Sequence, residues 1–260
     1  MMSKLYQGDC LTVMDNLISE GVKVDAIITD PPYGTTACKW DSVIPFADMW
    51  QRLKLLRKER TPIVLFGSEP FSSALRMSNI KEYKYDWIWN KKLAGNGILA
   101  KKQPLKIHEI VSIFYKHDYY PVKTKGIMRK KMGLKSSEIT GGKAFAEETK
   151  NDEYYPKSII EFSMGNYRRG RIHPTQKSTE LMEYLIKTYT NEKETVLDFA
   201  MGSGTTGVAC KQLNRDFIGI ELEEKYFKIA ENRIKKAVRQ DELFKPEAIQ
   251  ENIYSQKELL

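Results

Sequence analysis

Six short runs of β-branched, aromatic and other apolar residues recur along the chain and predict strands. They occupy residues 24–29, 63–66, 85–89, 107–115, 195–199 and 216–221. Most of them are almost continuously apolar, which is typical of strands that are covered on both faces. The runs therefore predict a sheet that is buried between two layers of other elements.

Helical periodicity appears between and after several of these runs. Leu181, Leu185 and Thr188 fall on one helical face, and Ser178 is placed to serve as the N-cap. A second helix is predicted over residues 222–238 from the spacing of its apolar residues. Strands that alternate with helices predict an α/β fold with a doubly wound, mostly parallel sheet.

The segment 119–171 breaks this alternation. It shows no clear period, and glycines interrupt it at several positions. We interpret it as an insertion between two halves of one domain, which cover residues 1–118 and 172–238. The tail, 239–260, is strongly charged and is assigned to neither half.

Composition narrows the class of protein. The chain has 260 residues, of which 41% are hydrophobic, and this is enough for one sizeable core. Its apolar runs are far shorter than the roughly 18 residues that a membrane-spanning helix needs. Its first residues lack the apolar centre of a secretion signal. We therefore expect a cytoplasmic protein with no membrane partner.

Cysteine and histidine positions do not indicate a metal site. Cys10, Cys38 and Cys210 are odd in number and form no Cys-x-x-Cys pair, so neither a disulfide framework nor a zinc cluster is predicted. The three histidines lack the spacing of metal ligands. We expect no bound metal.

Positive charge is concentrated in the middle of the chain. The formal net charge is +8, and residues 91–180 hold 19 Lys and Arg against 9 Asp and Glu. Lysines and arginines neutralise phosphates, and the tyrosines among them can stack on unpaired bases. A solvated, lysine-rich surface is the alternative. If nucleic acid is the partner, the expected contact residues are Lys123, Lys125, Arg129, Lys130, Lys131, Arg168, Arg169 and Arg171.

A glycine-rich turn follows the strand predicted at 195–199. Gly202, Gly204 and Gly207 form a Gly-x-Gly-x-x-Gly pattern, and a helix-compatible segment follows them. Glu221 ends the next strand, where a carboxylate can accept hydrogen bonds from ribose hydroxyls. This constellation indicates an adenosyl cofactor, although these residues alone leave NAD open.

A rigid tetrapeptide, Asp30-Pro31-Pro32-Tyr33, follows the strand 24–29. It lies at the carboxyl end of that strand, where open α/β sheets bind ligands. The prolines stiffen the loop and remove two backbone donors, so Asp30 and the Pro31 carbonyl form a pair of acceptors beside the Tyr33 ring. This arrangement suits a flipped base with an exocyclic amino group. The alternative is that the prolines only end the strand and that Asp30 caps a turn.

Together these motifs resemble the amino-specific DNA methyltransferases that use S-adenosylmethionine, in the motif order called class β. In that circularly permuted order the Asp-Pro-Pro-Tyr motif precedes the target-recognition region, and the cofactor glycine motif comes last. The run from His173 to Lys177 is similar to the family's His-Pro-Thr-Gln-Lys-Pro cofactor motif, with Ser178 in place of the final proline. Gly8-Asp9-Cys10 is similar to the family's strand-end Gly-Asp near the cofactor adenine.

The resemblance implies a role for each motif. Residues 1–118 would be the catalytic half, with Asp30, Pro31, Pro32 and Tyr33 at its site, and 119–171 the target-recognition insertion. Residues 172–238 would be the cofactor-binding half. The implied cofactor-binding residues are Asp9, Cys10, His173, Pro174, Thr175, Gln176, Lys177, Asp198, Phe199, Ala200, Gly202, Ser203, Gly204, Thr205, Thr206 and Glu221. The implied cofactor is S-adenosylmethionine and the implied partner is double-stranded DNA, and a homodimer would be in keeping with the family.

The implied reaction is site-specific methylation of adenine N6. The Asp-Pro-Pro-Tyr form is usual for adenine in this family, whereas a serine in the first position is common for cytosine N4, which stays the alternative. Hydrogen bonds to Asp30 and the Pro31 carbonyl would favour a more nucleophilic amine, which would attack the sulfonium methyl in line. Methylation at cytosine C5 is not indicated, because it needs a nucleophilic cysteine, typically after a proline, and no cysteine here follows a proline.

Functions of other classes explain less of the sequence. An NAD-dependent oxidoreductase would use Gly202, Gly204, Gly207 and Glu221, but it would not explain the tetrapeptide or the basic segment. A non-catalytic nucleic-acid-binding module has no need for an acid at Glu221. Methylation of RNA or protein stays open, although the class β order favours DNA.

Overall fold

The computed structural model describes residues 2–35, 41–131, 149–163 and 176–240. They divide into two compact units, of which one is Pro121–Lys157 and the other is formed by the segments on either side of it. No helix in these described ranges is long and apolar enough to cross a membrane.

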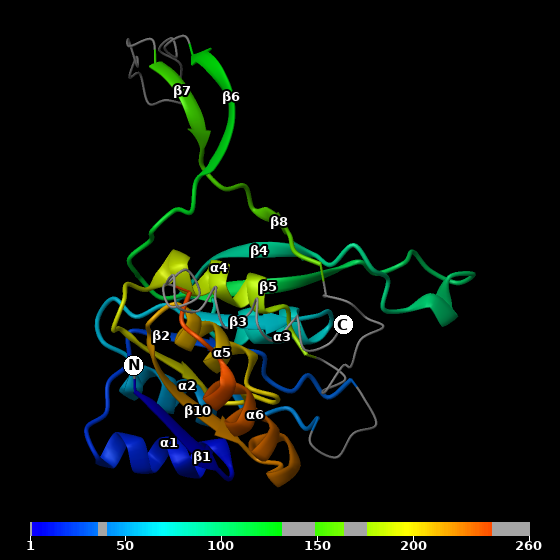
Figure 1. Cartoon of the computed structure of the whole chain (residues 1–260). Helices are drawn as coiled ribbons and strands as arrows, with labels where there is room; N and C mark the ends of the chain where they lie inside the picture. The colour runs from blue at the N-terminus through cyan, green and yellow to red at the C-terminus, as the bar shows by residue number, and fades with distance from the viewer. Residues whose placement is uncertain (1, 36–40, 132–148, 164–175, 241–260) are drawn as a thin grey trace, which may run out of the picture. The chain divides into compact units, whose positions relative to one another are not determined.

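The larger unit is built on an eight-stranded sheet (Figure 1). In spatial order its strands are β1 (Ser3–Gln7), β10 (Asp216–Glu221), β9 (Thr195–Asp198), β2 (Ala26–Thr29), β3 (Ile63–Gly67), β5 (His108–Phe114), β4 (Tyr83–Asn90) and β8 (Ile159–Glu161). Neighbouring strands are parallel except that β5 runs antiparallel to β3 and β4. The predicted α/β class with a mostly parallel sheet is confirmed.

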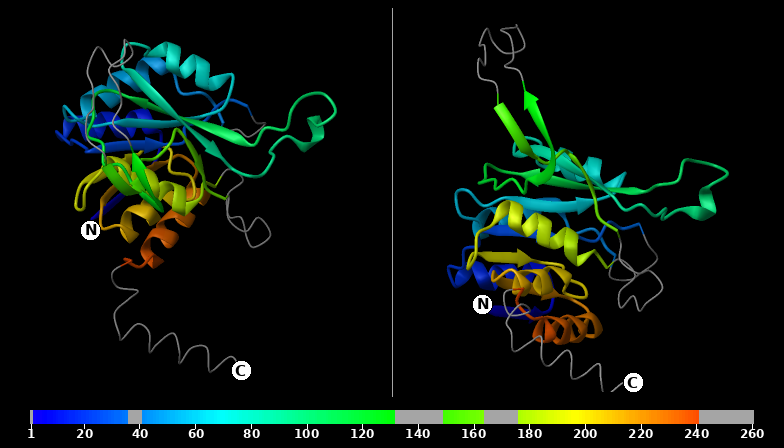
Figure 2. Two further views of the ribbon diagram at one scale, coloured as in Figure 1. Left: turned by 90° about the horizontal axis from the view of Figure 1, so that it is seen from above. Right: turned by 45° about the horizontal axis from the view of Figure 1, so that its top comes forward.

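Helices cover both faces of this sheet (Figure 2). Successive strand residues point to opposite faces, so Ile27 and Ile28 of β2 belong to different hydrophobic clusters. The Ile27 cluster includes residues of α1 (Cys10–Ser19), α2 (Phe46–Leu56) and α3 (Phe71–Ser78). The Ile28 cluster includes residues of α4 (Thr179–Tyr189), α5 (Thr205–Gln212) and α6 (Glu224–Lys236). The sheet is therefore doubly wound.

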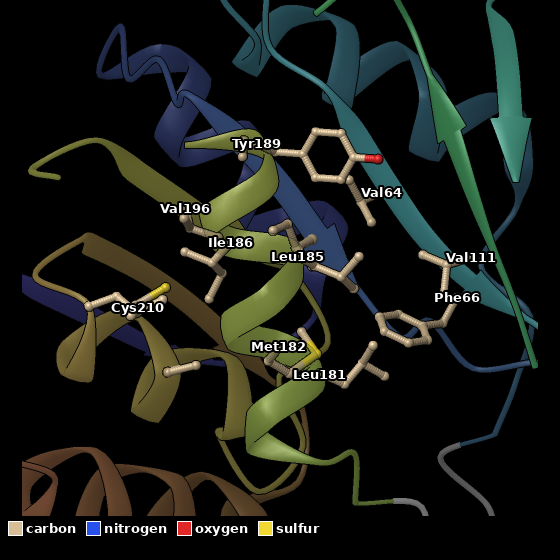
Figure 3. Close-up of a cluster of buried hydrophobic side chains, with 14 of the residues drawn as sticks. Val64, Phe66, Val111, Leu181, Met182, Leu185, Ile186, Tyr189, Val196 and Cys210 are labelled. Atoms are coloured by element: carbon tan, nitrogen blue, oxygen red, sulfur yellow. The ribbon is translucent and has the colours of Figure 1, made fainter. Parts of the chain in front are cut away.

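The core beneath α4 fixes the start of that helix. Leu181 and Leu185 are fully buried and belong to one cluster with Val64 and Phe66 of β3 (Figure 3). Because α4 is held against the sheet in this way, the residues just before it, Gln176 and Lys177, reach the edge where the parallel strands end.

The six predicted strands and the two periodic helices are confirmed, with differences at their edges. Ser178 is the N-cap of α4, but its side chain makes no capping hydrogen bond. The helix-compatible segment was placed after Gly207, but the helix begins earlier, at Thr205. β1 and β8 were not predicted, because they lie at the two ends of the sheet and most of their residues are exposed.

The smaller unit contains an antiparallel pair, β6 (Thr124–Lys131) and β7 (Thr149–Tyr154). The Tyr154 hydroxyl donates to the Ile127 carbonyl at 2.6 Å. The side chains of Ile127 and Met128 are 80% and 59% exposed. Because the strands bury neither of these side chains, they show no apolar alternation, and no period could be recognised in this segment.

Candidate active site

The carboxyl ends of four strands open into one cavity of about 600 Å³. β1, β10, β9 and β2 are parallel neighbours, so the segments that follow them meet at one edge of the sheet. Residues 8–11, 30–33 and 198–203 line the cavity together with Glu221. The motifs at the two ends of the sequence therefore share one site.

Asp30 faces this cavity with 22% of its side chain exposed. The Tyr33 hydroxyl donates a short hydrogen bond to its Oδ1, and Lys177 Nζ lies 2.6 Å from its Oδ2. Burial raises the pKa of the Asp30 carboxyl, and the Lys177 ammonium opposes that shift. Burial and the charge of Asp30 raise the pKa of Tyr33, so its hydroxyl stays protonated and donates. Any further donor at Asp30 must compete with these two groups.

Lys177 is shared between two carboxylates. Its Nζ also lies 3.0 Å from Glu109 Oε2, and Lys91 Nζ lies 3.0 Å from Glu109 Oε1. Burial opposes ionisation of Glu109, but the two ammonium groups outweigh it and hold the pKa of Glu109 below its usual range. Burial likewise disfavours charge on Lys177, but Asp30 and Glu109 more than compensate and raise its pKa. Opposite charges thus alternate through Asp30, Lys177, Glu109 and Lys91.

Asp41 organises the backbone after the tetrapeptide. Its Oδ1 accepts from the amides of Tyr33 at 2.7 Å and Gly34 at 2.9 Å, and its Oδ2 accepts from the Thr35 amide at 2.9 Å. Gly34 has a φ of 68°, which is unfavourable for residues with a Cβ. One buried carboxylate therefore fixes the turn that carries Tyr33.

The Tyr33 ring is oriented by α3. It stacks on Phe71, with ring centroids 4.9 Å apart and an interplanar angle of 28°. Phe71 is buried at the first position of α3. Since Tyr33 lines the cavity while it stacks on Phe71, the site presents a fixed aromatic surface beside Asp30.

The glycine-rich turn is held by Asp198 and Glu221. Asp198 Oδ2 accepts from the Thr206 hydroxyl at 2.5 Å, and its Oδ1 accepts from the Ala200 amide at 3.2 Å. Burial nevertheless raises the pKa of Asp198 to about 7. Glu221 accepts from the Gly202 amide at 2.8 Å through Oε2, and burial raises its pKa as well.

Gly204 serves the packing of this turn. It has a φ of 76° and precedes α5, and a Cβ there would lie 2.8 Å from the Ala230 Cβ of α6. Gly202, by contrast, lines the cavity. The two glycines of the motif therefore have separate structural tasks.

The segment after β1 completes the wall beside Glu221. The Gly8 amide donates to the Glu221 carbonyl at 2.9 Å. Asp9 caps α1 by accepting from the Thr12 amide at 3.0 Å. Burial and the neighbouring Asp9 raise the pKa of the Cys10 thiol to about 11, so Cys10 stays protonated and is a poor nucleophile.

Apart from Gly204, which packs against Ala230 of α6, the structure places the predicted site residues in three groups. Those that line the cavity are Asp9, Cys10, Asp30, Pro31, Pro32, Tyr33, Gln176, Lys177, Asp198, Phe199, Ala200, Gly202, Ser203, Thr205, Thr206 and Glu221. Lys123, Lys125, Arg129, Lys130 and Lys131 belong to the smaller unit. His173, Pro174, Thr175, Arg168, Arg169 and Arg171 lie outside the described residues. Among the described residues, no cluster of three His, Cys, Asp or Glu side chains is arranged to hold a metal ion.

Sequence reasoning missed Asp41, Glu109 and Lys91. Two prolines before Tyr33 leave the loop few backbone N–H donors of its own. This was a signal that a nearby acid accepts hydrogen bonds from the amides that follow. Glu109 and Lys91 lie at the site because β5 is antiparallel, so its beginning and the end of β4 share the edge where β3 ends. No residue pattern indicated that direction.

Comparison with known proteins identifies relatives over most of the chain. A family model described as DNA methylase matches residues 24–232. The type II methyltransferase M.HpaI of Haemophilus parainfluenzae is 28% identical over 249 residues, covering 90% of this chain and 74% of the relative. The DNA adenine methyltransferase YhdJ of Escherichia coli is 25% identical, covering 88% of this chain and 82% of the relative.

Solved structures agree with these relatives. M1.HpyAVI in complex with SAM superposes with a TM-score of 0.63 at 28% identity, and the match covers 90% of this chain and 99% of that one. The cytosine-N4-specific PvuII DNA methyltransferase has a TM-score of 0.62 at 15% identity, with 90% of this chain and 86% of that one covered. The second likeness concerns the fold alone.

Proposed function

Because the chain belongs to this family of DNA methylases, we propose that it methylates an exocyclic amino group of a flipped base in double-stranded DNA. The methyl donor is S-adenosylmethionine, and adenine N6 is the preferred target. Cytosine N4 is the alternative. The observation that carries the proposal is that Asp30 and Tyr33 share one cavity with the Asp198–Glu221 turn region, so base and cofactor can meet there.

The residues at the cavity fit a cationic adenosyl cofactor. Among the described residues, six acids and two lysines line it, which suits a sulfonium ion. The Gln176 side-chain oxygen is buried and has no hydrogen-bond partner within the described part of the chain. Such an acceptor calls for a donor from a bound molecule. When bound, the cofactor supplies an electrophilic methyl group.

Asp30 prepares the amine for attack. The lone pair of an exocyclic amine is delocalised into the ring, and hydrogen bonds from its N–H groups to Asp30 and the Pro31 carbonyl favour a more tetrahedral, nucleophilic nitrogen. This nitrogen would take the methyl group from the bound sulfonium, which would leave as a neutral thioether, and the nitrogen would then lose one proton. The raised pKa of Asp30 helps that carboxylate to receive the proton.

Before the base binds, Lys177 and Tyr33 occupy the two carboxylate oxygens of Asp30. One of their hydrogen bonds to Asp30 must give way to the amine. Lys177 can yield without becoming an isolated buried charge, because Glu109 remains 3.0 Å away. Tyr33 keeps its ring position through Phe71 and offers a surface for base stacking.

The smaller unit supplies groups for phosphate contact. Lys125 and Arg129 are exposed on β6. Arg129 also lies over the Tyr154 ring, 5.6 Å from its centroid. We expect Lys125→Gln and Arg129→Gln each to weaken DNA binding and to lower the slope of log affinity against log salt by about 1.

Methyl transfer with isotope label tests the proposal. The protein is incubated with tritiated S-adenosylmethionine and unmethylated genomic DNA, and the nucleosides are then separated. Label in N6-methyladenine supports the proposal as stated, and label in N4-methylcytosine moves only the target base. If the cofactor binds but no label enters DNA, the proposal fails. RNA or protein then becomes the substrate to test.

A further inference from the structure

The connection between β4 and β5, residues 91–107, ends in an exposed apolar tip. A short 3₁₀ helix, η1 (Gly97–Leu99), forms this tip, and it projects beyond the ends of the strands (Figures 1 and 2). Ile98 is 99% exposed and Leu99 is 39% exposed. Single exposed apolar side chains are common, so a function for this tip requires a defined backbone and suitable neighbours.

Hydrogen bonds give the connection a defined form. Asn96 donates through Nδ2 to the Pro104 carbonyl at 3.1 Å and accepts from the Lys106 amide at 2.7 Å. The Gly95 amide donates to the Lys106 carbonyl at 3.2 Å. These bonds join the two arms on either side of η1, so Ile98 lies exposed at the end of a hydrogen-bonded turn.

The connection carries lysines and no acid, and the two lysines that are free within the described residues follow the tip. Residues 91–108 contain five lysines and no Asp or Glu. Lys101 and Lys102 follow the tip directly, and both are exposed. Within the described part of the chain neither forms an ion pair. An apolar tip followed by two unneutralised cations fits a polyanion that also offers flat apolar surfaces, which is the chemistry of stacked DNA bases.

The first residues of the connection, next to β4, belong to the active site. Leu93, Ala94 and Gly95 line the catalytic cavity, and Lys91 contacts Glu109. Three chain steps separate Gly95 from Ile98, so their Cα atoms are at most about 11 Å apart. Bases in one strand are about 3.4 Å apart. The tip can therefore reach only the neighbourhood of a base that occupies the cavity.

We propose that residues 91–107 contact the duplex beside the target base and that Ile98 inserts into the base stack there as an apolar wedge. The inference rests on the proposed base-flipping function. Extrusion of a base costs a few kcal/mol and leaves a gap in the stack, and apolar side chains such as isoleucine stabilise unstacked steps in other DNA complexes. Ile98 would stabilise the extruded state, and Lys101 and Lys102 would neutralise the flanking phosphates.

Ile98→Ala tests the wedge, and Ile80→Ala is the matched control. Ile80 is 52% exposed and lies outside both the cavity and the connection. Each variant is assayed on the duplex that the wild-type protein methylates and on the same duplex with a mismatch at the target base, which lowers the cost of extrusion. We expect Ile98→Ala to lower kcat/KM about tenfold on the paired duplex and less than about threefold on the mismatched one. Ile80→Ala leaves both values unchanged.

Other outcomes overturn the inference. Equal losses on the two duplexes would make Ile98 an ordinary contact, and no loss would exclude it from the reaction. A change in the sedimentation of the DNA-free protein on Ile98→Ala would show that the tip contacts a second copy of the chain. Absence of methyl transfer to any DNA by the wild-type protein would instead defeat the proposed function, so the two failures are distinguishable.

Discussion

Lys177 Nζ lies 2.6 Å from Asp30 Oδ2, so a residue just before α4 holds the acid that follows β2. The same nitrogen contacts Glu109 at 3.0 Å. The carboxylate that we propose as catalytic and the segment that we propose to bind the cofactor, 172–238, are thereby coupled through one cation. A base amine that displaces Lys177 from Asp30 leaves it paired with Glu109, which keeps the cost of that exchange low.

Asp30→Asn should abolish most methyl transfer. Asparagine keeps the shape of the side chain but has one acceptor oxygen, and its NH₂ group opposes the amine. We expect kcat to fall at least about a hundredfold, while S-adenosylmethionine binding by titration calorimetry changes less than about twofold. Asp15→Asn, at an exposed ion pair with Arg52, is the control. Unchanged turnover in the Asp30 variant would remove it from the mechanism.

Lys177→Met should shift the acid limb of the pH–rate profile to higher pH. Loss of the ammonium leaves burial and Glu109 to raise the pKa of Asp30 further, so the carboxylate forms only in more alkaline solution. Activity lost near neutral pH should then be partly regained as pH rises. Lys177→Arg keeps the charge and should keep the midpoint close to that of the wild type. Identical midpoints in the Met and Arg variants would contradict the coupling.

Asp41→Ala should loosen the catalytic turn. Three amide hydrogen bonds are lost, and we expect the free energy of unfolding to fall by about 1–3 kcal/mol. The amides of Tyr33, Gly34 and Thr35 should exchange with deuterium faster, as measured by mass spectrometry. Glu231→Ala, at an exposed carboxylate of α6, should change neither property. Unaltered exchange at 33–35 would show that other contacts fix the turn.

Asp198 should make the cofactor-free protein less stable as pH rises. An unfolded aspartate has a pKa of about 3.9, whereas burial raises the pKa of Asp198 to about 7. Between those values the folded protein retains a proton that the unfolded chain has released, so the stability from this group is lost as pH rises through that window. Between pH 5 and pH 8, the Tm of the Asp198→Asn variant should therefore fall less than the Tm of the wild type. Parallel Tm changes would argue against a protonated Asp198.

Much of the fold could be predicted because the central strands are buried on both faces. β2 and β3 are apolar at almost every position, and Ile27 and Ile28 show why, since each faces a different helical layer. β1 lacks this signal because it is an edge strand with exposed polar residues. Its position was indicated only by the likeness of Gly8-Asp9 to a family motif.

The candidate site was predictable where its residues follow strands and not where it depends on strand direction. The positions of Asp30 and Glu221 could be predicted because apolar runs that predict strands lead up to them. Glu109 is the second residue of β5. An apolar run looks the same whether the strand is parallel or antiparallel, so the position of Glu109 at the site could not be inferred. Lys177 was expected at the cofactor from its motif, and only the packing of α4 brings it to Asp30.

The pairing of β1 has a consequence for how the protein is made. Among the described strands, β1 hydrogen-bonds only to β10, with Ser3 opposite Phe217 and Gln7 opposite Glu221. At 5–20 residues per second, a ribosome needs roughly 10–40 seconds between the two strands. During synthesis the first strand therefore stays unpaired until β10 has been made, and the wall formed by Gly8 and Glu221 closes only then. A nascent chain therefore carries its Asp-Pro-Pro-Tyr loop before the cavity that we propose for the methyl donor has formed.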